Sequence, residues 1–210
     1  MTRVLLLHGF EHTRPRTHWM WWLAESLRGR RVPVQYPQLP TPHAPSLEEW
    51  ASLARAELEM LGDGERVVVT HSLGGILWQH VASEAVRHAH PELLADRVLM
   101  VAPPHPSRLT GALAPFALDG TEAPALARVA RDTRIVARET DPYRPGPAGD
   151  LARDWGLAVH VLPGAGHLNP DDGHGPWQAV LDWVVGGGSR NAGAGDVEWR
   201  LGEGARSLDA

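Results

Sequence analysis

Short apolar runs alternate with segments of helical periodicity along most of the chain. The runs at 4–7, 32–36, 67–69, 97–102, 133–137 and 159–162 are predicted to be strands. Apolar side chains at helical spacing predict helices over 17–27, 46–61, 73–81, 151–155 and 177–185. This alternation is typical of an α/β fold with a doubly wound, mostly parallel sheet, here of about six strands. The pattern leaves little or no room for a cap domain.

Two segments interrupt the alternation. Residues 103–124 contain five prolines and only weak periodicity, so they form either the edge of a lid over a site or a long surface excursion, and we favour the lid edge. A Gly-Gly-Gly-Ser run after Val185 begins a tail rich in small residues, whose apolar patch at 197–201 is too short to form a core alone. We therefore expect one domain over residues 1–185 and a flexible tail over residues 186–210.

Composition narrows the class of protein. The chain has 210 residues, of which 43% are hydrophobic and 21% are charged, as in a single soluble domain. The net charge of -5, without a basic stripe, argues against nucleic acid as a partner and favours a small neutral substrate. The apolar runs are all shorter than the roughly 20 residues of a membrane span, so we expect no membrane partner. The first strand begins without a leader-like segment before it, so we expect a cytoplasmic protein.

Two residue types are missing, which excludes several chemistries. All 20 basic residues are arginine, so a lysine-dependent phosphate loop or a Schiff base with pyridoxal phosphate cannot form. The chain also lacks cysteine, which removes disulfides, thiolate nucleophiles and thiolate metal sites. Serine or threonine must therefore supply any nucleophile, and we expect no cofactor.

Ser72 is the candidate nucleophile. It lies in residues 70–75, Thr-His-Ser-Leu-Gly-Gly, between a predicted strand and a predicted helix. This is the position of the Gly-x-Ser-x-Gly turn that exposes the nucleophile of α/β hydrolases, with Gly74 in the second glycine position and Thr70 in place of the first. The alternative is a serine that only caps the following helix.

Asp141 and His167 complete a candidate catalytic triad. In α/β hydrolases the acid and the histidine follow the serine in that order, on loops after later strands, and these two residues match in order and placement. Taken singly, Asp141 could merely start a turn before Pro142, and His167 could be an ordinary loop histidine. Because all three residues fit the required order, the sequence predicts a Ser-His-Asp triad.

Backbone groups beside the serine are candidates for the oxyanion hole. We expect one N-H donor from Leu73, and a second from Phe10, in the loop after the first strand. His8 ends that strand, and we expect it to support the loop through hydrogen bonds rather than to join the triad.

A local acidic cluster after His167 has two interpretations. Asp171, Asp172 and His174 offer oxygen and nitrogen atoms to a metal ion, but their spacing matches no metal motif. We therefore favour a polar loop that supports His167, and we expect no metal site.

Several short motifs resemble one family of small serine hydrolases, which includes the retinoblastoma-binding serine hydrolase and bacterial YdeN-like proteins. The resemblance spans about residues 3–185. The shared motifs are His8-Gly9, His18-Trp19, Trp22-Leu23, His71-Ser72, Asp141-Pro142-Tyr143, Leu151-Ala152, Trp155-Gly156, Gly166-His167-Leu168-Asn169 and Gly173-His174-Gly175-Pro176-Trp177. The resemblance implies an α/β-hydrolase fold and assigns nucleophile, acid and base to Ser72, Asp141 and His167.

These observations predict a serine hydrolase that cleaves a small carboxylic ester or amide through an acyl-enzyme intermediate. The alternative is a catalytically weak protein that keeps the hydrolase fold and acts as a protein-interaction module. An intact triad favours the enzyme, because an interaction module has no need of a histidine and an aspartate behind a serine.

Overall fold

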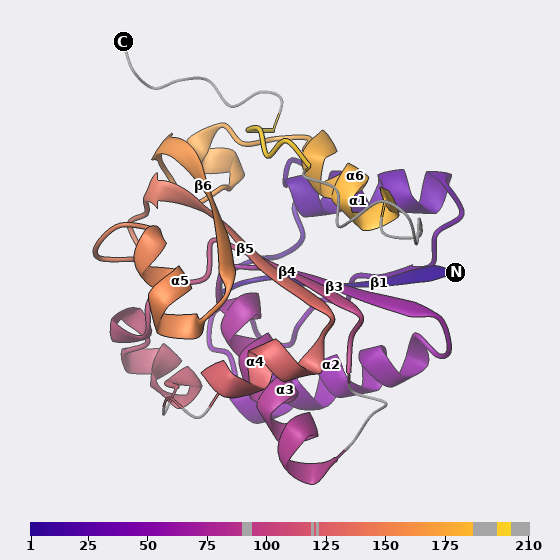
Figure 1. The fold of residues 1–210 in the computed structure, drawn as a ribbon, viewed down its shortest axis with the longest axis horizontal. Helices are drawn as coiled ribbons and strands as arrows, with labels where there is room; N and C mark the ends of the chain where they lie inside the picture. Colours follow the sequence, from indigo (N-terminus) through magenta and orange to yellow (C-terminus); the bar gives the residue numbers. More distant parts are fainter. Residues whose placement is uncertain (90–93, 119, 121, 187–196, 203–210) are drawn as a thin grey trace.

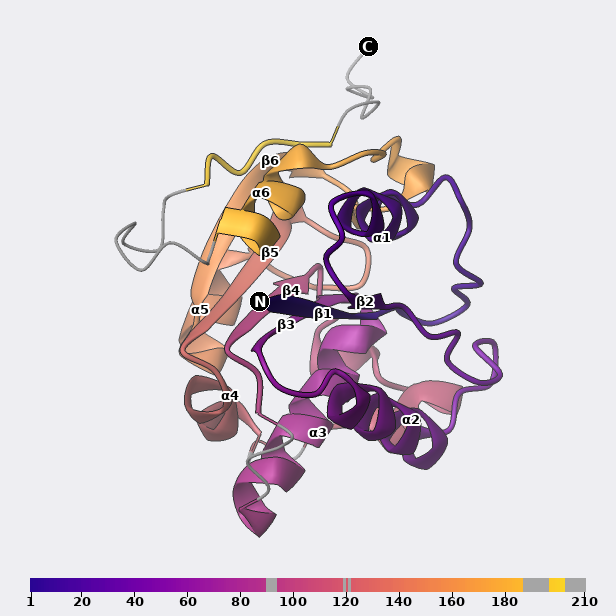
Figure 2. The same ribbon diagram turned by 90° about the vertical axis from the view of Figure 1, so that its right-hand side faces the viewer.

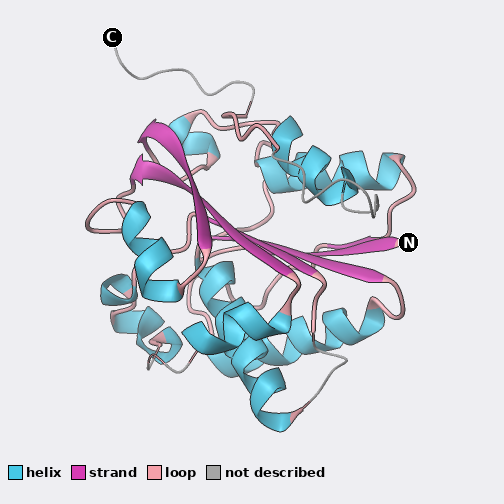
Figure 3. Cartoon of the chain, viewed as in Figure 1, coloured by secondary structure: helices cyan, strands magenta, loops and turns pink. Residues whose placement is uncertain are grey.

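A six-stranded parallel sheet forms the centre of the protein. The computed structural model describes residues 1–89, 94–118, 120, 122–186 and 197–202 (Figure 1). In these residues the sheet has the order β2-β1-β3-β4-β5-β6, and all neighbouring strands run parallel (Figure 3). The strands are β1 (Thr2–Leu7), β2 (Val34–Gln35), β3 (Glu65–His71), β4 (Arg97–Val101), β5 (Asp132–Thr140) and β6 (Ala158–Ala165). The predicted fold class is confirmed.

Helices cover both faces of the sheet. They are α1 (Trp19–Gly29), α2 (Leu47–Met60), α3 (Leu73–His88), α4 (Ala123–Val129), α5 (Gly149–Trp155) and α6 (Gln178–Gly186), with short 3-10 helices η2 (Pro106–Arg108), η3 (Gly111–Phe116) and η4 (Pro170–Asp172). Helices α1 and α6 lie together on one face, and α2 to α5 lie on the other (Figures 1 and 2). None of the helices in the described part of the chain is both long and apolar enough to cross a lipid bilayer.

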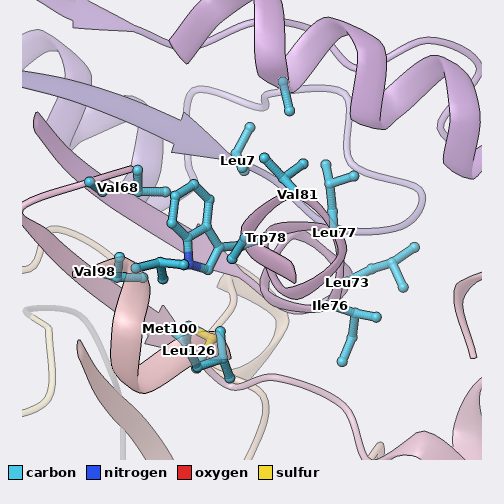
Figure 4. Close-up of a cluster of buried hydrophobic side chains, with 14 of the residues drawn as sticks. Leu7, Val68, Leu73, Ile76, Leu77, Trp78, Val81, Val98, Met100 and Leu126 are labelled. Atoms are coloured by element: carbon cyan, nitrogen blue, oxygen red, sulfur yellow. The ribbon is translucent and has the colours of Figure 1, made fainter. Parts of the chain in front are cut away.

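The two faces bury two separate cores. In β1, Val4 and Leu6 face α1 and α6, whereas Leu5 and Leu7 face α2 and α3. A strand covered on both sides must be apolar at every position, which explains the continuous apolar runs in the sequence. On the α3 side, Trp78 is fully buried and lies against strand side chains such as Val68 and Val98 (Figure 4).

The order of the strands positions a site. The chain passes from β1 to β2 on one side and then returns to β3 on the other side, so the strand order reverses between β1 and β3. In open α/β sheets ligands bind outside the carboxyl ends of the strands at such a reversal. The turns after Leu7 and His71 therefore meet where a site is expected.

Helix and strand boundaries differ slightly from the prediction. Helix α1 is capped by His18 rather than Thr17, because the His18 Nδ1 atom accepts a hydrogen bond of 3.2 Å from the backbone N-H of Met20. Ser46 caps α2 as predicted, since its Oγ atom accepts from Glu49 N-H at 3.3 Å. The second strand pairs only at 34–35, on the sheet edge, as Pro33 predicts.

The described residues of the 103–124 segment, 103–118, 120 and 122–124, lie against the domain. They form η2, η3 and the start of α4, and Leu109 and Phe116 are buried in the core on the α3 side. The segment is anchored by these two side chains, and part of it forms a wall of the cavity described below.

Residues 197–202, which we call the strap, lie against the domain. The backbone carbonyl of Arg200 accepts a hydrogen bond of 2.6 Å from Trp177 Nε1, and the Trp199 ring lies 5.4 Å from the ring of His160 on β6. Gly202 is buried close to the carbonyls of Gly175 and Pro176. The strap thus packs on the core, whereas tail residues 187–196 and 203–210 lie outside the described residues.

Replacing Trp199 by alanine should lower the free energy of unfolding by about 1–2 kcal/mol, because a large, partly buried ring leaves its contacts with His160 and Trp177. Urea unfolding measures this change. The matched control is Glu198→Ala, which removes only an exposed ion pair with Arg200 and should change stability little. Equal effects of the two substitutions would contradict the packing of the strap.

Candidate active site

Ser72 occupies a strained turn between β3 and α3. Its backbone φ is 53°, in the left-handed region that non-glycine residues rarely adopt. The turn is held by its neighbours, since Ser72 N-H donates to the carbonyl of Val101 at 2.9 Å and Gly75 N-H donates to the carbonyl of Ser72 at 2.9 Å. The serine makes no side-chain cap to α3, so the capping interpretation is wrong.

Two glycines allow the end of β1 to approach this turn. A Cβ atom on Gly9 would lie 2.7 Å from the Cβ atom of Ser72, and one on Gly74 would overlap the carbonyl oxygen of Leu7. Neither position has room for a side chain, because backbone lies against both. Glycine at 74 is thus a packing requirement of the site.

Thr70 replaces the usual first glycine without loss of the turn. It lies within β3, paired with Leu7, and is fully buried. Its Oγ1 atom would lie 3.3 Å from a Cβ atom on Gly75, so the glycine at 75 leaves the space that the threonine uses. Gly75 thus leaves room for the threonine that stands in place of the first glycine of the Gly-x-Ser-x-Gly pattern.

The three predicted triad residues lie together. His167 Nε2 is 2.8 Å from Ser72 Oγ, and His167 Nδ1 is 2.8 Å from Asp141 Oδ2. Both His167 and Asp141 are buried. Because the carboxylate can only accept, the Nδ1 atom carries a proton, which leaves Nε2 free to accept the hydroxyl proton of the serine.

The turn after β5 fixes the acid. Asp141 Oδ1 accepts from the backbone N-H of Tyr143 at 2.8 Å, and Arg144 N-H donates to the carbonyl of Asp141 at 3.0 Å. The Arg144 guanidinium donates to the carbonyls of Arg138 and Glu139 at 2.7 and 3.2 Å, and burial lowers its pKa. Asp141 therefore both starts a turn and contacts His167. Its interpretation as a turn residue is compatible with its interpretation as a triad residue.

Asp172 holds the loop that carries His167. Its carboxylate accepts from the backbone N-H groups of His167 and Asn169, and it leaves no room for a side chain on Gly166, whose φ is 134°. On the other side, Trp19 Nε1 donates to the carbonyl of Leu168 at 2.9 Å. The expected support of His167 by this polar loop is confirmed.

The neighbouring acidic cluster has no metal-binding geometry. In the described part of the chain, no three His, Cys, Asp or Glu side chains converge so that they could hold a metal ion. Asp172 faces backbone N-H groups, and the buried ring of His174 lies 4.4 Å from the ring of Trp177.

Five histidine rings form a string that ends at His167. The sequence did not predict this arrangement. Ring centroids lie 4.9 Å apart for His8 and His12, 4.6 Å for His12 and His18, 4.9 Å for His18 and His71, and 5.0 Å for His71 and His167. His71 Nε2 donates to the carbonyl of His167 at 2.9 Å, so the residue before Ser72 also positions His167. The only sequence signal was the number of histidines near predicted strand ends.

Burial keeps His8, His12, His18 and His71, the first four histidines of this string, neutral. It lowers the pKa of His8 to about 4 and that of His12 to about 3, and it holds the pKa values of His18 and His71 well below their usual range. His8 Nε2 accepts from Leu39 N-H at 2.9 Å while its Nδ1 atom donates to the carbonyl of Gly9 at 2.9 Å. The expected support of the loop by His8 is confirmed, and the hydrogen bond from Leu39 requires the neutral ring.

A cavity of about 470 Å³ opens above Ser72. Phe10 and Leu73, the expected oxyanion residues, both line it, and Leu73 is the first residue of α3, where backbone N-H groups have no partner within the helix. Its lining includes Arg108, Leu109 and Leu113 from the segment after β4, together with Tyr143 and the loop after His167. A more open hollow of about 600 Å³ lies at the opposite end of the sheet, around residues 63–66 and 94–96, away from Ser72.

Comparison with known proteins decides the family. The sequence profile described as "Serine hydrolase" matches residues 4–185. The chain belongs to the serine hydrolase family. It is accordingly an enzyme with hydrolase activity, and the family region ends before the strap begins. Comparison with curated proteins gives no match.

Solved structures show the same fold as this serine hydrolase. The ydeN gene product from B. subtilis is 23% identical, with a TM-score of 0.70, and the match covers 89% of this chain and 98% of that chain. Est1E from Butyrivibrio proteoclasticus is 15% identical with a TM-score of 0.61, covering 87% and 84%. A thioesterase domain from the curacin biosynthetic pathway is 14% identical with a TM-score of 0.61, covering 87% and 91%.

Replacing Gly9 by alanine should lower kcat/KM at least ~100-fold, because the added methyl group must displace Ser72 by a substantial fraction of an ångström. Ester hydrolysis by the folded variant measures the loss. Gly29→Ala is the matched control: a Cβ atom there meets nothing within 4 Å, so kcat/KM should stay within about twofold. Wild-type activity of Gly9→Ala would show that the close approach is not required.

The buried histidines should make the protein sensitive to mild acid. Their pKa values are lower in the folded state than the roughly 6.5 of the unfolded chain, so between these values the unfolded chain binds more protons. The free energy of unfolding should therefore fall as pH decreases below about 6.5, by roughly 1 kcal/mol per pH unit for each such imidazole. Urea unfolding at about pH 7, 6 and 5 tests this.

The variant His8→Gln provides a control for that measurement. The glutamine oxygen can accept from Leu39 N-H in place of Nε2, but glutamine does not titrate. The slope of the free energy of unfolding against pH should therefore decrease by the contribution of about one proton. A wild-type stability that is constant over this pH range would contradict the neutral state of the histidines.

Proposed function

We propose that the protein is a carboxylesterase-like serine hydrolase with Ser72 as nucleophile, His167 as general base and Asp141 as the residue that orients His167. The observation that carries this proposal is the 2.8 Å contact between Ser72 Oγ and His167 Nε2 at a strained strand-to-helix turn. A serine hydroxyl is a weak nucleophile unless a base removes its proton, and the imidazole lies where it can do so.

The reaction proceeds in two steps. Ser72 Oγ attacks the substrate carbonyl while its proton passes to His167 Nε2, and the same imidazole then gives the proton to the departing oxygen, which leaves an acyl-enzyme. Water, deprotonated by His167, attacks the acyl carbonyl and releases the carboxylic acid and the free serine. Asp141 stabilises the imidazolium that forms in both steps.

The backbone N-H groups of Leu73 and Phe10 are the proposed oxyanion donors. Gly9 brings the loop after β1 against Ser72, and Leu73 begins α3 next to it. N-H groups at the start of a helix are unpaired within the helix and favour negative charge. Each donor contributes about 3 kcal/mol to transition-state stabilisation in comparable hydrolases.

The size and lining of the cavity support a small-molecule substrate. A volume of about 470 Å³ lies in the range of small-ligand sites, roughly 300–1,000 Å³. Apolar side chains such as Leu109 and Leu113 suit the acyl part of a small ester or amide. An interaction module, the alternative considered from the sequence, would gain nothing from the strained backbone of Ser72.

Labelling by a fluorophosphonate probe tests the nucleophile. The wild type should gain one adduct by intact-mass measurement, because the probe reacts with a serine that a neighbouring base activates. Ser72→Ala should not be labelled, and His167→Ala should be labelled far more slowly.

Ser107 offers a matched control. Its Oγ atom lies 2.8 Å from His105 Nδ1, so it forms a second serine-histidine pair, but this pair is solvent-exposed. Ser107→Ala should be labelled like the wild type. An adduct that persists in folded Ser72→Ala would remove Ser72 as the nucleophile, and an unlabelled wild type would favour the interaction module.

A further inference from the structure

The mechanism fixes which wall of the cavity meets the leaving group. The imidazole that takes the proton from Ser72 must deliver it to the departing oxygen, so this oxygen lies beside His167 Nε2. The carbonyl carbon lies over Ser72, and its acyl substituent points away from His167. The leaving group is therefore surrounded by the side chains that flank His167.

Tyr143 is the aromatic side chain at this position. Its ring centroid is 4.5 Å from that of His167, with an angle of 60° between the rings, and the residue lines the cavity. Its backbone N-H donates to Asp141 Oδ1 at 2.8 Å, so the turn that holds the acid also fixes Tyr143 beside the imidazole.

Tyr143 is also unusually exposed for a large ring at a structured site. The residue is 50% exposed. Among the described residues the other exposed large hydrophobic residues lie outside the cavity; they are Met1, Met60, Val161 and Val185. Tyr143 is thus the one exposed large hydrophobic residue, among those described, that also lines the cavity.

We infer that Tyr143 determines specificity for the leaving group and selects esters of aromatic alcohols. This inference rests on the proposed function. Aromatic rings prefer offset or edge-to-face contacts with centroids about 4.5–7 Å apart, which an open ring beside the cavity can make with a bound aryl group. The ester oxygen of such a substrate faces His167 Nε2 while its ring packs on Tyr143.

The other groups near this wall agree with a neutral aromatic alcohol. Asn169, Pro170 and Asp171 line the cavity on the His167 side, and Arg108 also lines it, so one carboxylate and one guanidinium face the same cavity. His105 N-H donates to the carbonyl of Tyr143 at 3.0 Å, so the segment that carries Leu109 lies beside Tyr143 and adds apolar contact for an aryl group.

Two esters that differ only in aromaticity test the inference. Benzyl acetate and cyclohexylmethyl acetate have the same acyl group and similar primary alcohols of similar size. The wild type should favour the benzyl ester in kcat/KM by roughly 2- to 12-fold, the range expected for one aromatic pair. The preference should fall to about one in Tyr143→Leu, which keeps the backbone contact to Asp141, and should persist in Tyr143→Phe.

Controls separate stacking from a positioning role of Tyr143. Val161→Ala alters an exposed side chain outside the cavity and should keep the wild-type ratio. Labelling of Tyr143→Leu at Ser72 by the fluorophosphonate, detected by intact mass, shows that the variant is folded and keeps a reactive serine. If both esters slow equally in Tyr143→Leu and the ratio persists, the ring acts on His167 alone and the specificity role is wrong.

The two proposals fail in distinguishable ways. A wild type that is labelled at Ser72 but hydrolyses both esters at equal kcat/KM, or neither ester, overturns the inference on Tyr143 and leaves the proposed nucleophile in place. A wild type that neither reacts with the probe nor hydrolyses the esters overturns both.

Discussion

The close contact between the ends of β1 and β3 is the constraint on which the site depends. Ser72 takes a left-handed backbone conformation only because the carbonyl of Val101 holds its N-H, and because Gly9 and Gly74 let the end of β1 lie against it. The same contact places the loop after β1 beside the serine. The parallel sheet sets both strand ends at one edge, so the strain is maintained by the packing of the whole core.

His167 and Asp141 lie on loops that are held by different contacts. Asp172 and Trp19 hold the backbone around His167 from two sides, and His71 links it to β3, which leads to Ser72. Asp141 is fixed by its own turn. Because burial keeps the neighbouring histidines uncharged, they pack beside His167 without adding positive charge there.

Much of the fold could be predicted from the sequence, because the central strands β1, β3 and β4 are buried on both faces and so contain continuous apolar runs. The order of Ser72, Asp141 and His167 along the chain likewise predicted residues that lie within hydrogen-bond distance. Contacts between distant loops could not be predicted in this way: nothing local pairs His71 with the carbonyl of His167, or Trp177 with Arg200. The N-cap at His18 was missed because histidine is a rare cap, and its role depends on a ring buried among other histidines.

The strap has a consequence for the strand that has the fewest neighbours in the sheet. Strand β6 lies at the edge and is hydrogen-bonded to β5 alone, so fewer strand contacts hold it in place than hold the central strands. The Trp199 ring lies against His160 of that strand and packs with the core on the α6 side. A segment beyond the family region thereby adds side-chain packing to the edge strand.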